Sequence, residues 1–284
     1  MSAATDYRFT GADGLQLYSR IYAGPAPQAP TVLCLHGLMH NGADFEELAP
    51  QLAVQHRVIV PDVRGRGLSA RDASPANYRI RTYVADVAAL LKGLAVSRVA
   101  VIGTSMGGLI GMVLAAAQPD LVSRLVLNDI GPEIEAAGLE RIRAYAGRTP
   151  PVHDWTQAAA QLRRFFDAAW PGLSEARWQQ LARRSYRADA EGLLHKDADP
   201  AIGEVLRDAQ GPAPDLWPLW QGLAHLPVLV IRGAASDILS AATVARMKRG
   251  RADLEVLTVA DRGHAPLLDE PQCVARITRF LAPQ

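Results

Sequence analysis

The feature that most constrains this chain is a buried strand that runs directly into a Gly-x-Ser-x-Gly motif and then into a helix. Residues 99–102 are four consecutive apolar residues, a pattern typical of a strand buried on both faces. Ser105 follows between Gly103 and Gly107, and an apolar stretch over residues 109–117 predicts the helix. So sharp a turn strains the serine backbone and leaves no room for side chains at either glycine. The pattern therefore predicts a nucleophile elbow; a glycine-rich turn with an incidental serine is the alternative.

Similar apolar runs recur along the chain with helical patterns between them. This alternation predicts a parallel, doubly wound sheet with right-handed crossovers, whose ligands bind at the carboxyl ends of the strands. An antiparallel hairpin over residues 7–22 adds an edge to the sheet. The expected buried strands are residues 31–35, 57–62, 99–102, 124–129, 227–233 and 254–259.

The alternation stops after residue 131. Residues 132–222 have helical patterns but no clear buried strand, and so long a segment within a compact domain needs structure of its own. We expect a helical cap over residues 132–222, inserted into a core domain of residues 1–131 and 223–284. All five tryptophans of the chain fall in this cap. Some of them, with Trp155 and Trp217 as candidates, are expected to bind substrate; packing within the cap is the alternative for each.

Composition and charge exclude several classes of function. The 284 residues carry a net charge of +1, and short basic runs such as residues 246–249 are typical of solvated helix faces, so no nucleic-acid partner is expected. The run at residues 64–69 lacks the Lys-Ser/Thr pair of a phosphate loop. Cys34 and Cys273 lie in apolar contexts that favour small buried side chains over a disulfide. With no leader or membrane-span pattern, we expect a cytoplasmic monomer or homodimer that takes a small-molecule substrate and no membrane partner.

Two polar residues follow the last two predicted strands of the sheet, at the same edge as Ser105. A serine hydroxyl needs a base to take its proton, and the base needs a third group to orient it. His264 is the expected base and Asp237 the expected acid, and the chain order Ser, Asp, His suits this sheet topology. Asp129, at the end of the strand predicted over residues 124–129, lies at the same edge of the sheet.

A second loop at this edge is expected to stabilise negative charge. His36-Gly37 follows the strand at residues 31–35, and the sharp turn can direct the N–H of Leu38 toward the same anion as the N–H of Met106. His36 itself is expected to brace the loop. His40 is expected to bind substrate at the pocket mouth, with an ordinary surface position as the alternative.

Taken together and in this order, these motifs resemble the α/β-hydrolase superfamily over nearly the whole chain. The resemblance implies Ser105 as nucleophile, His264 as base, Asp237 as acid, the N–H groups of Leu38 and Met106 as oxyanion hole, and no cofactor. Some members of the family carry the acid after the preceding strand, which makes Asp129 the alternative acid here. It also implies that the insertion before residue 227 sets specificity. The motifs are His36-Gly37, Asp62-x-Arg64-Gly65-x-Gly67-x-Ser69, Gly103-Thr104-Ser105-Met106-Gly107-Gly108, Arg232-Gly233-x-x-Ser236-Asp237 and Gly263-His264.

The function expected from these residues is hydrolysis of a carboxylic ester or lactone of a small to medium apolar acyl compound through an acyl-enzyme. Two alternatives keep the same triad: a carbon–carbon bond hydrolase or perhydrolase, and a ligand-binding or receptor protein that does not turn over. Ser105 argues against the dehalogenases and epoxide hydrolases of this fold, which use an aspartate nucleophile. Thr104 stands where carbon–carbon hydrolases often have asparagine.

Overall fold

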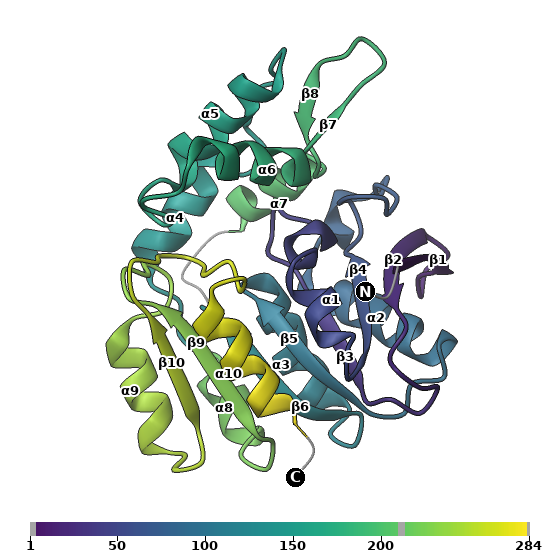
Figure 1. The fold of residues 1–284 in the computed structure, drawn as a ribbon, viewed down its shortest axis with the longest axis vertical. Coiled ribbons are helices and arrows are strands. Elements are labelled where there is room, and N and C mark those ends of the chain that lie inside the picture. The colour runs from purple at the N-terminus through teal and green to yellow at the C-terminus, as the bar shows by residue number, and fades with distance from the viewer. Residues whose placement is uncertain (1–3, 210–213, 283–284) are drawn as a thin grey trace.

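The computed structural model describes residues 4–209 and 214–282. One eight-stranded sheet forms the centre of the molecule, and a separate group of helices stands over one end of it (Figure 1). The predicted α/β architecture, with a mostly parallel eight-stranded sheet, is confirmed. None of the helices in the described residues has the length and apolar character needed to cross a membrane.

The sheet contains each of the predicted strands. Its order is β1-β2-β4-β3-β5-β6-β9-β10, in which β2 pairs antiparallel with β1 and β4 and all other neighbours pair parallel. After β3 the chain forms β4 on one side of it and then β5 on its other side, so the strand order reverses between β3 and β5. A ligand is expected in the crevice at the carboxyl ends of these two strands. The strands are β1 (Ala4–Thr10), β2 (Gln16–Tyr22), β3 (Thr31–Leu35), β4 (Arg57–Asp62), β5 (Val99–Thr104), β6 (Val122–Asn128), β9 (Val228–Gly233) and β10 (Glu255–Val259).

Helices cover both faces of the sheet, because alternate residues of each central strand point to opposite sides. In β3, Leu33 and Leu35 join the core cluster under α2 (Ile80–Gly93), α3 (Met106–Ala117), α8 (Trp217–Gly222) and α9 (Ala241–Arg249). Val32 and Cys34 join the cluster under α1 (Leu48–Leu52) and α10 (Pro271–Leu281), which includes Cys273. Both cysteines are buried and free, as predicted. Short 3₁₀ helices occupy Gly42–Phe45 and Pro75–Asn77.

The cap has its own small hydrophobic core and stands over the carboxyl ends of the strands (Figure 1). Aromatic side chains dominate this core, with Trp178 fully buried at its centre. The cap elements are α4 (Ala136–Tyr145), α5 (Trp155–Phe166), α6 (Glu175–Ser185), β7 (Tyr186–Ala188), β8 (Leu194–Lys196) and α7 (Ala201–Asp208).

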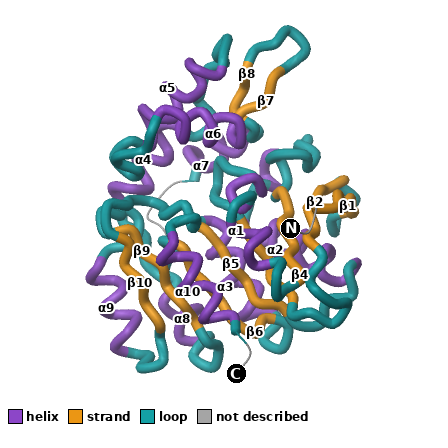
Figure 2. The backbone as a smooth tube through the Cα atoms, viewed as in Figure 1, coloured by secondary structure: helices purple, strands orange, loops and turns teal. Residues whose placement is uncertain are grey.

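The predicted cap differs from the structure in two places. Only helices were expected in the cap, but α6 ends at Ser185 and the chain then forms the β7–β8 hairpin, whose three-residue strands are too short to show an alternating pattern. The predicted end of the cap at residue 222 is also wrong, because α8 packs against α3 and buries Trp220 in the core domain. Figure 2 shows α8 beside the sheet, far from α4 to α7.

Candidate active site

Ser105 lies between β5 and α3 in a strained backbone conformation. Its φ is 52°, in the left-handed region that residues with side chains rarely adopt. A Cβ atom at Gly103 would lie 2.4 Å from the backbone of Gly107, and one at Gly107 would lie 2.1 Å from the carbonyl oxygen of Leu35. Both glycines are therefore required by close packing, as the motif predicts, and the tight turn leaves Ser105 at the wall of a cavity.

A series of hydrogen bonds joins Ser105, His264 and Asp129. His264 Nε2 lies 2.9 Å from Ser105 Oγ, and His264 Nδ1 lies 2.8 Å from Asp129 Oδ2. Asp129 is fully buried, and its carboxylate also accepts hydrogen bonds from the Gly233 amide and the Ser236 hydroxyl. These donors fix the carboxylate, which in turn holds the imidazole with Nε2 directed at the serine.

The prediction that Asp237 orients His264 is wrong in this structure. Asp237 instead forms a two-point ion pair with Arg141 of the cap, in which Arg141 Nε and one terminal nitrogen lie 2.6 and 2.9 Å from the two carboxylate oxygens. Burial alone would raise the pKa of Asp237, but the hydrogen bonds from Arg141 outweigh it and keep that pKa below its ordinary value. The alternative residue, Asp129, holds the position, and Ser236, the residue before Asp237, donates its hydroxyl to the Asp129 carboxylate.

The loop after β3 is braced by His36. Its Nε2 accepts a 3.0 Å hydrogen bond from the amide of Val63, and its Nδ1 lies 2.8 Å from the carbonyl oxygen of Gly37. Burial, with a contribution from the charge of Arg66, lowers the pKa of His36 to about 3. His36 is therefore a neutral structural group, as expected, and it holds the turn that carries Leu38.

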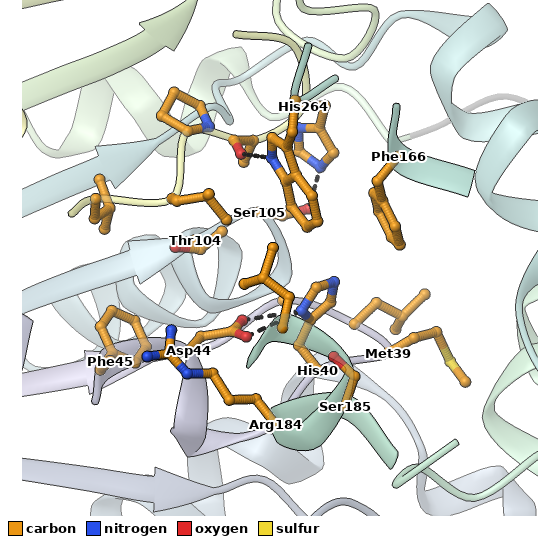
Figure 3. Close-up of a pocket in the computed structure, with 18 of the residues that line it drawn as sticks. Met39, His40, Asp44, Phe45, Thr104, Ser105, Phe166, Arg184, Ser185 and His264 are labelled. Carbon is orange, nitrogen blue, oxygen red and sulfur yellow. Dashed lines mark hydrogen bonds and ion pairs between the residues drawn. The ribbon is translucent and has the colours of Figure 1, made fainter. Parts of the chain in front are cut away.

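Ser105 and His264 open into a cavity of about 60 Å³ between the sheet and the cap. His40 and Asp44 lie across this cavity from them (Figure 3), with His40 Nδ1 3.0 Å from the Asp44 carboxylate. The placement of His40 on the cavity wall agrees with its prediction, and Leu38 lines the same cavity. The cap contributes Ile142, Tyr145, Phe166, Trp170, Arg177, Leu181, Arg184 and Ser185.

The sequence matches a model of the alpha/beta hydrolase fold over residues 30–271. This chain belongs to the α/β-hydrolase family. It is 36% identical over 262 residues to the 3-hydroxybutyrate-oligomer hydrolase of Cupriavidus necator, a match that covers 89% of each protein. It is 29% identical over 253 residues to the 2-(acetamidomethylene)succinate hydrolase of Mesorhizobium japonicum, covering 89% of this chain and 88% of that protein.

A solved α/β hydrolase of Novosphingobium aromaticivorans has the same fold. The two structures superpose with a TM-score of 0.93 at 42% sequence identity, over 99% of each chain. Because the named relatives and the family are hydrolases, this α/β hydrolase is an enzyme of that class.

The two tryptophans predicted to bind substrate do not line the cavity of the hydrolase. Trp155 packs under the guanidinium of Arg183 at 4.7 Å, and Trp217 lies 3.8 Å from that of Arg246. Both predictions are therefore wrong. Trp170 lines the cavity instead, and its indole N–H donates a 2.8 Å hydrogen bond to the carbonyl oxygen of Ala265.

Trp170 and the arginines of α6 are the site residues that sequence reasoning missed. The side chains of Arg177 and Arg184 reach the cavity wall but are held by acidic residues, both of them by Glu47. Only the folded cap brings these residues near Ser105, so no local motif in the sequence marks them. Within residues 4–209 and 214–282, no group of three or more His, Cys, Asp or Glu side chains is arranged to hold a metal ion.

Proposed function

We propose that this hydrolase cleaves a carboxylic ester or lactone through an acyl-enzyme formed on Ser105. The observation that carries the proposal is the continuous hydrogen-bonded series from Ser105 Oγ through His264 to the buried carboxylate of Asp129. His264 Nε2 takes the serine proton as the oxygen attacks the carbonyl carbon, and Asp129 stabilises the imidazolium that forms.

The oxyanion produced by this attack needs hydrogen-bond donors in fixed positions. We assign this role to the backbone N–H groups of Leu38 and Met106. Leu38 lines the cavity beside Ser105, and Met106 is the first residue of α3, where the helix dipole favours negative charge. Loss of one such donor typically costs about 10² to 10³ in rate, so the pair accounts for a large part of the acceleration.

The rest of the cycle follows from the same groups. His264 returns its proton to the leaving alcohol, which departs and leaves the acyl group on Ser105. Water then attacks the acyl carbon while His264 accepts the water proton, and the second tetrahedral species collapses to release the acid and restore the serine hydroxyl. No further group is required to balance either step.

The cavity suits a short acyl chain. It encloses about 60 Å³, and its apolar wall is formed by Met39, Phe45, Phe166 and Trp170 among others. The relative from Cupriavidus necator is named for 3-hydroxybutyrate oligomers, whose units are short hydroxy acids joined by esters. We therefore propose an ester of a short carboxylic acid, with the cap setting the specificity and His40 in contact with the substrate.

Labelling with a fluorophosphonate tests this function directly. Intact mass is measured after brief exposure of the wild type and of the Ser105→Ala variant, followed by assays on esters and lactones of increasing acyl length. One adduct on the wild type and none on the variant, with multiple turnover of short esters, is the expected result. A folded wild type that takes no adduct would contradict the proposal and favour a ligand-binding protein.

A further inference from the structure

Lys196 ends strand β8 of the cap with its ammonium group inside the protein. The Nζ atom is buried and has no hydrogen-bond partner among the described residues. The centre of the Tyr186 ring lies 5.3 Å from it, close enough for a weak cation–π contact. The chain has only two other lysines, Lys92 and Lys248, and both are exposed. Burying an ammonium group without a hydrogen-bond acceptor destabilises the folded protein. The burial of Lys196 therefore indicates a function other than stability.

The acidic groups near Lys196 are engaged elsewhere. Asp44 is paired with His40 at 3.0 Å, and Asp197 is paired with Arg187 at 3.0 Å and also accepts a hydrogen bond from Asn41. Burial lowers the pKa of Lys196 to about 8, although the charges of Asp44 and Asp197 oppose this shift. At neutral pH the group is therefore mostly protonated, with negative charge nearby but no acceptor in contact.

The ammonium borders a small side pocket that adjoins the candidate active site. This pocket encloses about 10 Å³, the space of roughly one small polar group. Met39, Tyr145 and Phe166 line both this pocket and the cavity in front of Ser105, so the two spaces lie against the same side chains. Lys196 is the one lysine or arginine on the wall of the side pocket, whose other residues are apolar or carry a hydroxyl.

The arginines of the larger cavity do not offer an equivalent group. Arg177 is held by Glu47 and Asp269, and Arg184 is held by Glu46 and Glu47. Each of these guanidinium groups is already neutralised by carboxylates. An anionic substrate in the cavity would gain more from an ammonium that still lacks an acceptor than from a paired guanidinium.

We propose that Lys196 binds a free carboxylate carried by the substrate at the end away from the ester bond. This inference rests on the proposed function, since it names the class of ester: one derived from a short acid with a second, ionised carboxyl group. One carboxylate oxygen fits the side pocket, while the acyl chain lies in the cavity against Met39 and Phe166. Met39, with its unbranched side chain, is the residue that can turn to join the two spaces.

Titration of glutarate into the protein tests the subsite without requiring turnover. The dissociation constant is measured by calorimetry for the wild type, for Lys196→Met, and for the exposed-lysine control Lys92→Met. We expect glutarate to bind the wild type and the control equally and to bind Lys196→Met about tenfold more weakly or worse. Equal binding to all three proteins, or no binding to any of them, would overturn the proposal.

A pair of esters tests the same subsite during catalysis. One is the p-nitrophenyl monoester of glutarate, which has a terminal carboxylate, and the other is the neutral p-nitrophenyl pentanoate. Lys196→Met is expected to lower kcat/KM for the anionic ester about tenfold and to leave the neutral ester unchanged, which also shows that the variant is folded. If Lys196→Met does not fold, Lys196→Gln replaces it in both experiments. An equal effect on both esters, or on neither, contradicts the subsite.

The two experiments keep the two proposals apart. If Lys196→Met binds glutarate and cleaves the anionic ester as the wild type does, while Ser105 is still labelled by fluorophosphonate, the role of Lys196 is removed and the serine mechanism stands. Glutarate binding that depends on Lys196, in a protein whose Ser105 takes no label, would support the subsite and contradict the serine mechanism.

Discussion

Arg66 donates a 2.9 Å hydrogen bond from Nε to the carbonyl oxygen of Leu38. Its terminal nitrogens reach the carbonyl oxygen of Arg64 and, at 3.4 Å, the sulfur of Met106. The side chain is 1% exposed, and no carboxylate of the described residues forms an ion pair with it; the ring of Tyr83 lies 4.9 Å away. One buried guanidinium therefore contacts both of the residues whose N–H groups we assign to the oxyanion hole.

The first prediction concerns this guanidinium. Arg66→Met should lower kcat for a neutral ester by about 10- to 100-fold with little change in KM, because the oxyanion exists only after attack. Arg66→Lys should recover part of the loss, since it keeps the charge without the fixed hydrogen bond to Leu38. Steady-state kinetics and the affinity for a boronic acid, which mimics the tetrahedral species, give the measurement.

A matched control separates positioning from stability. Arg251 is also buried, donates to the carbonyl oxygens of Leu223 and Leu226, and lies 4.9 Å from the ring of Trp220, but it has no hydrogen bond to Leu38 or Met106. Arg251→Met should reduce the melting temperature as Arg66→Met does and leave kcat unchanged. Equal losses of kcat in the two variants would show that Arg66 acts only through stability.

The second prediction compares two aspartates. Asp129→Asn should reduce kcat by about 10⁴, the effect of the equivalent change in a serine protease, because an amide can no longer hold His264 in the required tautomer. Asp237→Asn should leave kcat within a few-fold, since it breaks only a half-exposed ion pair with Arg141 worth about 1 kcal/mol or less. Kinetics on one ester and thermal unfolding of both variants provide the test; the reverse order of kcat would restore Asp237 as the acid.

These two aspartates also show how much of the site the sequence predicts. The strand pattern predicted the sheet, the elbow at Ser105 and the loop of His264, because each depends on local periodicity and on glycines in contact with neighbouring backbone. Asp129 and Asp237 follow β6 and β9, which are adjacent in the sheet, so spacing along the chain places both near the histidine. The choice between them depends on how the loop after β9 turns, which brings Ser236 to Asp129 and is not encoded in any motif.

The cap was less predictable for the same reason. The amphipathic patterns in the sequence predict its helices. They do not predict the tryptophan that faces Ser105, because that depends on how the cap packs on the core. Trp170 reaches the cavity, whereas Trp155 and Trp217 lie under surface arginines. The position of Lys196 could not be predicted either, because strand β8 has only three residues and leaves no recognisable pattern in the sequence.

The third prediction concerns Trp170, which ties the cap to the loop of the histidine. Its N–H donates to the carbonyl oxygen of Ala265, next to His264, and the amide of Gly263 donates 2.7 Å to the carbonyl oxygen of Ala169. Trp170→Phe removes the first of these bonds and should lower kcat about fivefold, as small shifts of a base are costly. Trp155→Phe, which lies outside the cavity, should retain wild-type kinetics; an equal loss in both variants would count against this role.

The last prediction is a pH dependence that follows from Lys196. Its pKa is lowered from 10.5 to about 8 by burial, against the opposing charges of Asp44 and Asp197, so the ammonium loses its proton as the pH rises through about 8. The ratio of kcat/KM for the anionic ester to that for the neutral ester should therefore fall across this range. Both esters are cleaved by the same groups in the proposed mechanism, so any effect of pH on those groups cancels in the ratio.

The same shift links Lys196 to stability. Between about pH 8 and pH 10.5 the unfolded chain binds more protons at this position than the folded one, so the free energy of unfolding should rise with pH through its contribution. In Lys196→Met both the ratio of the two esters and this contribution should become independent of pH, which assays and urea unfolding between pH 6 and pH 10 would measure. A wild-type ratio that stays constant through pH 8 would mean that the ammonium does not contact the substrate.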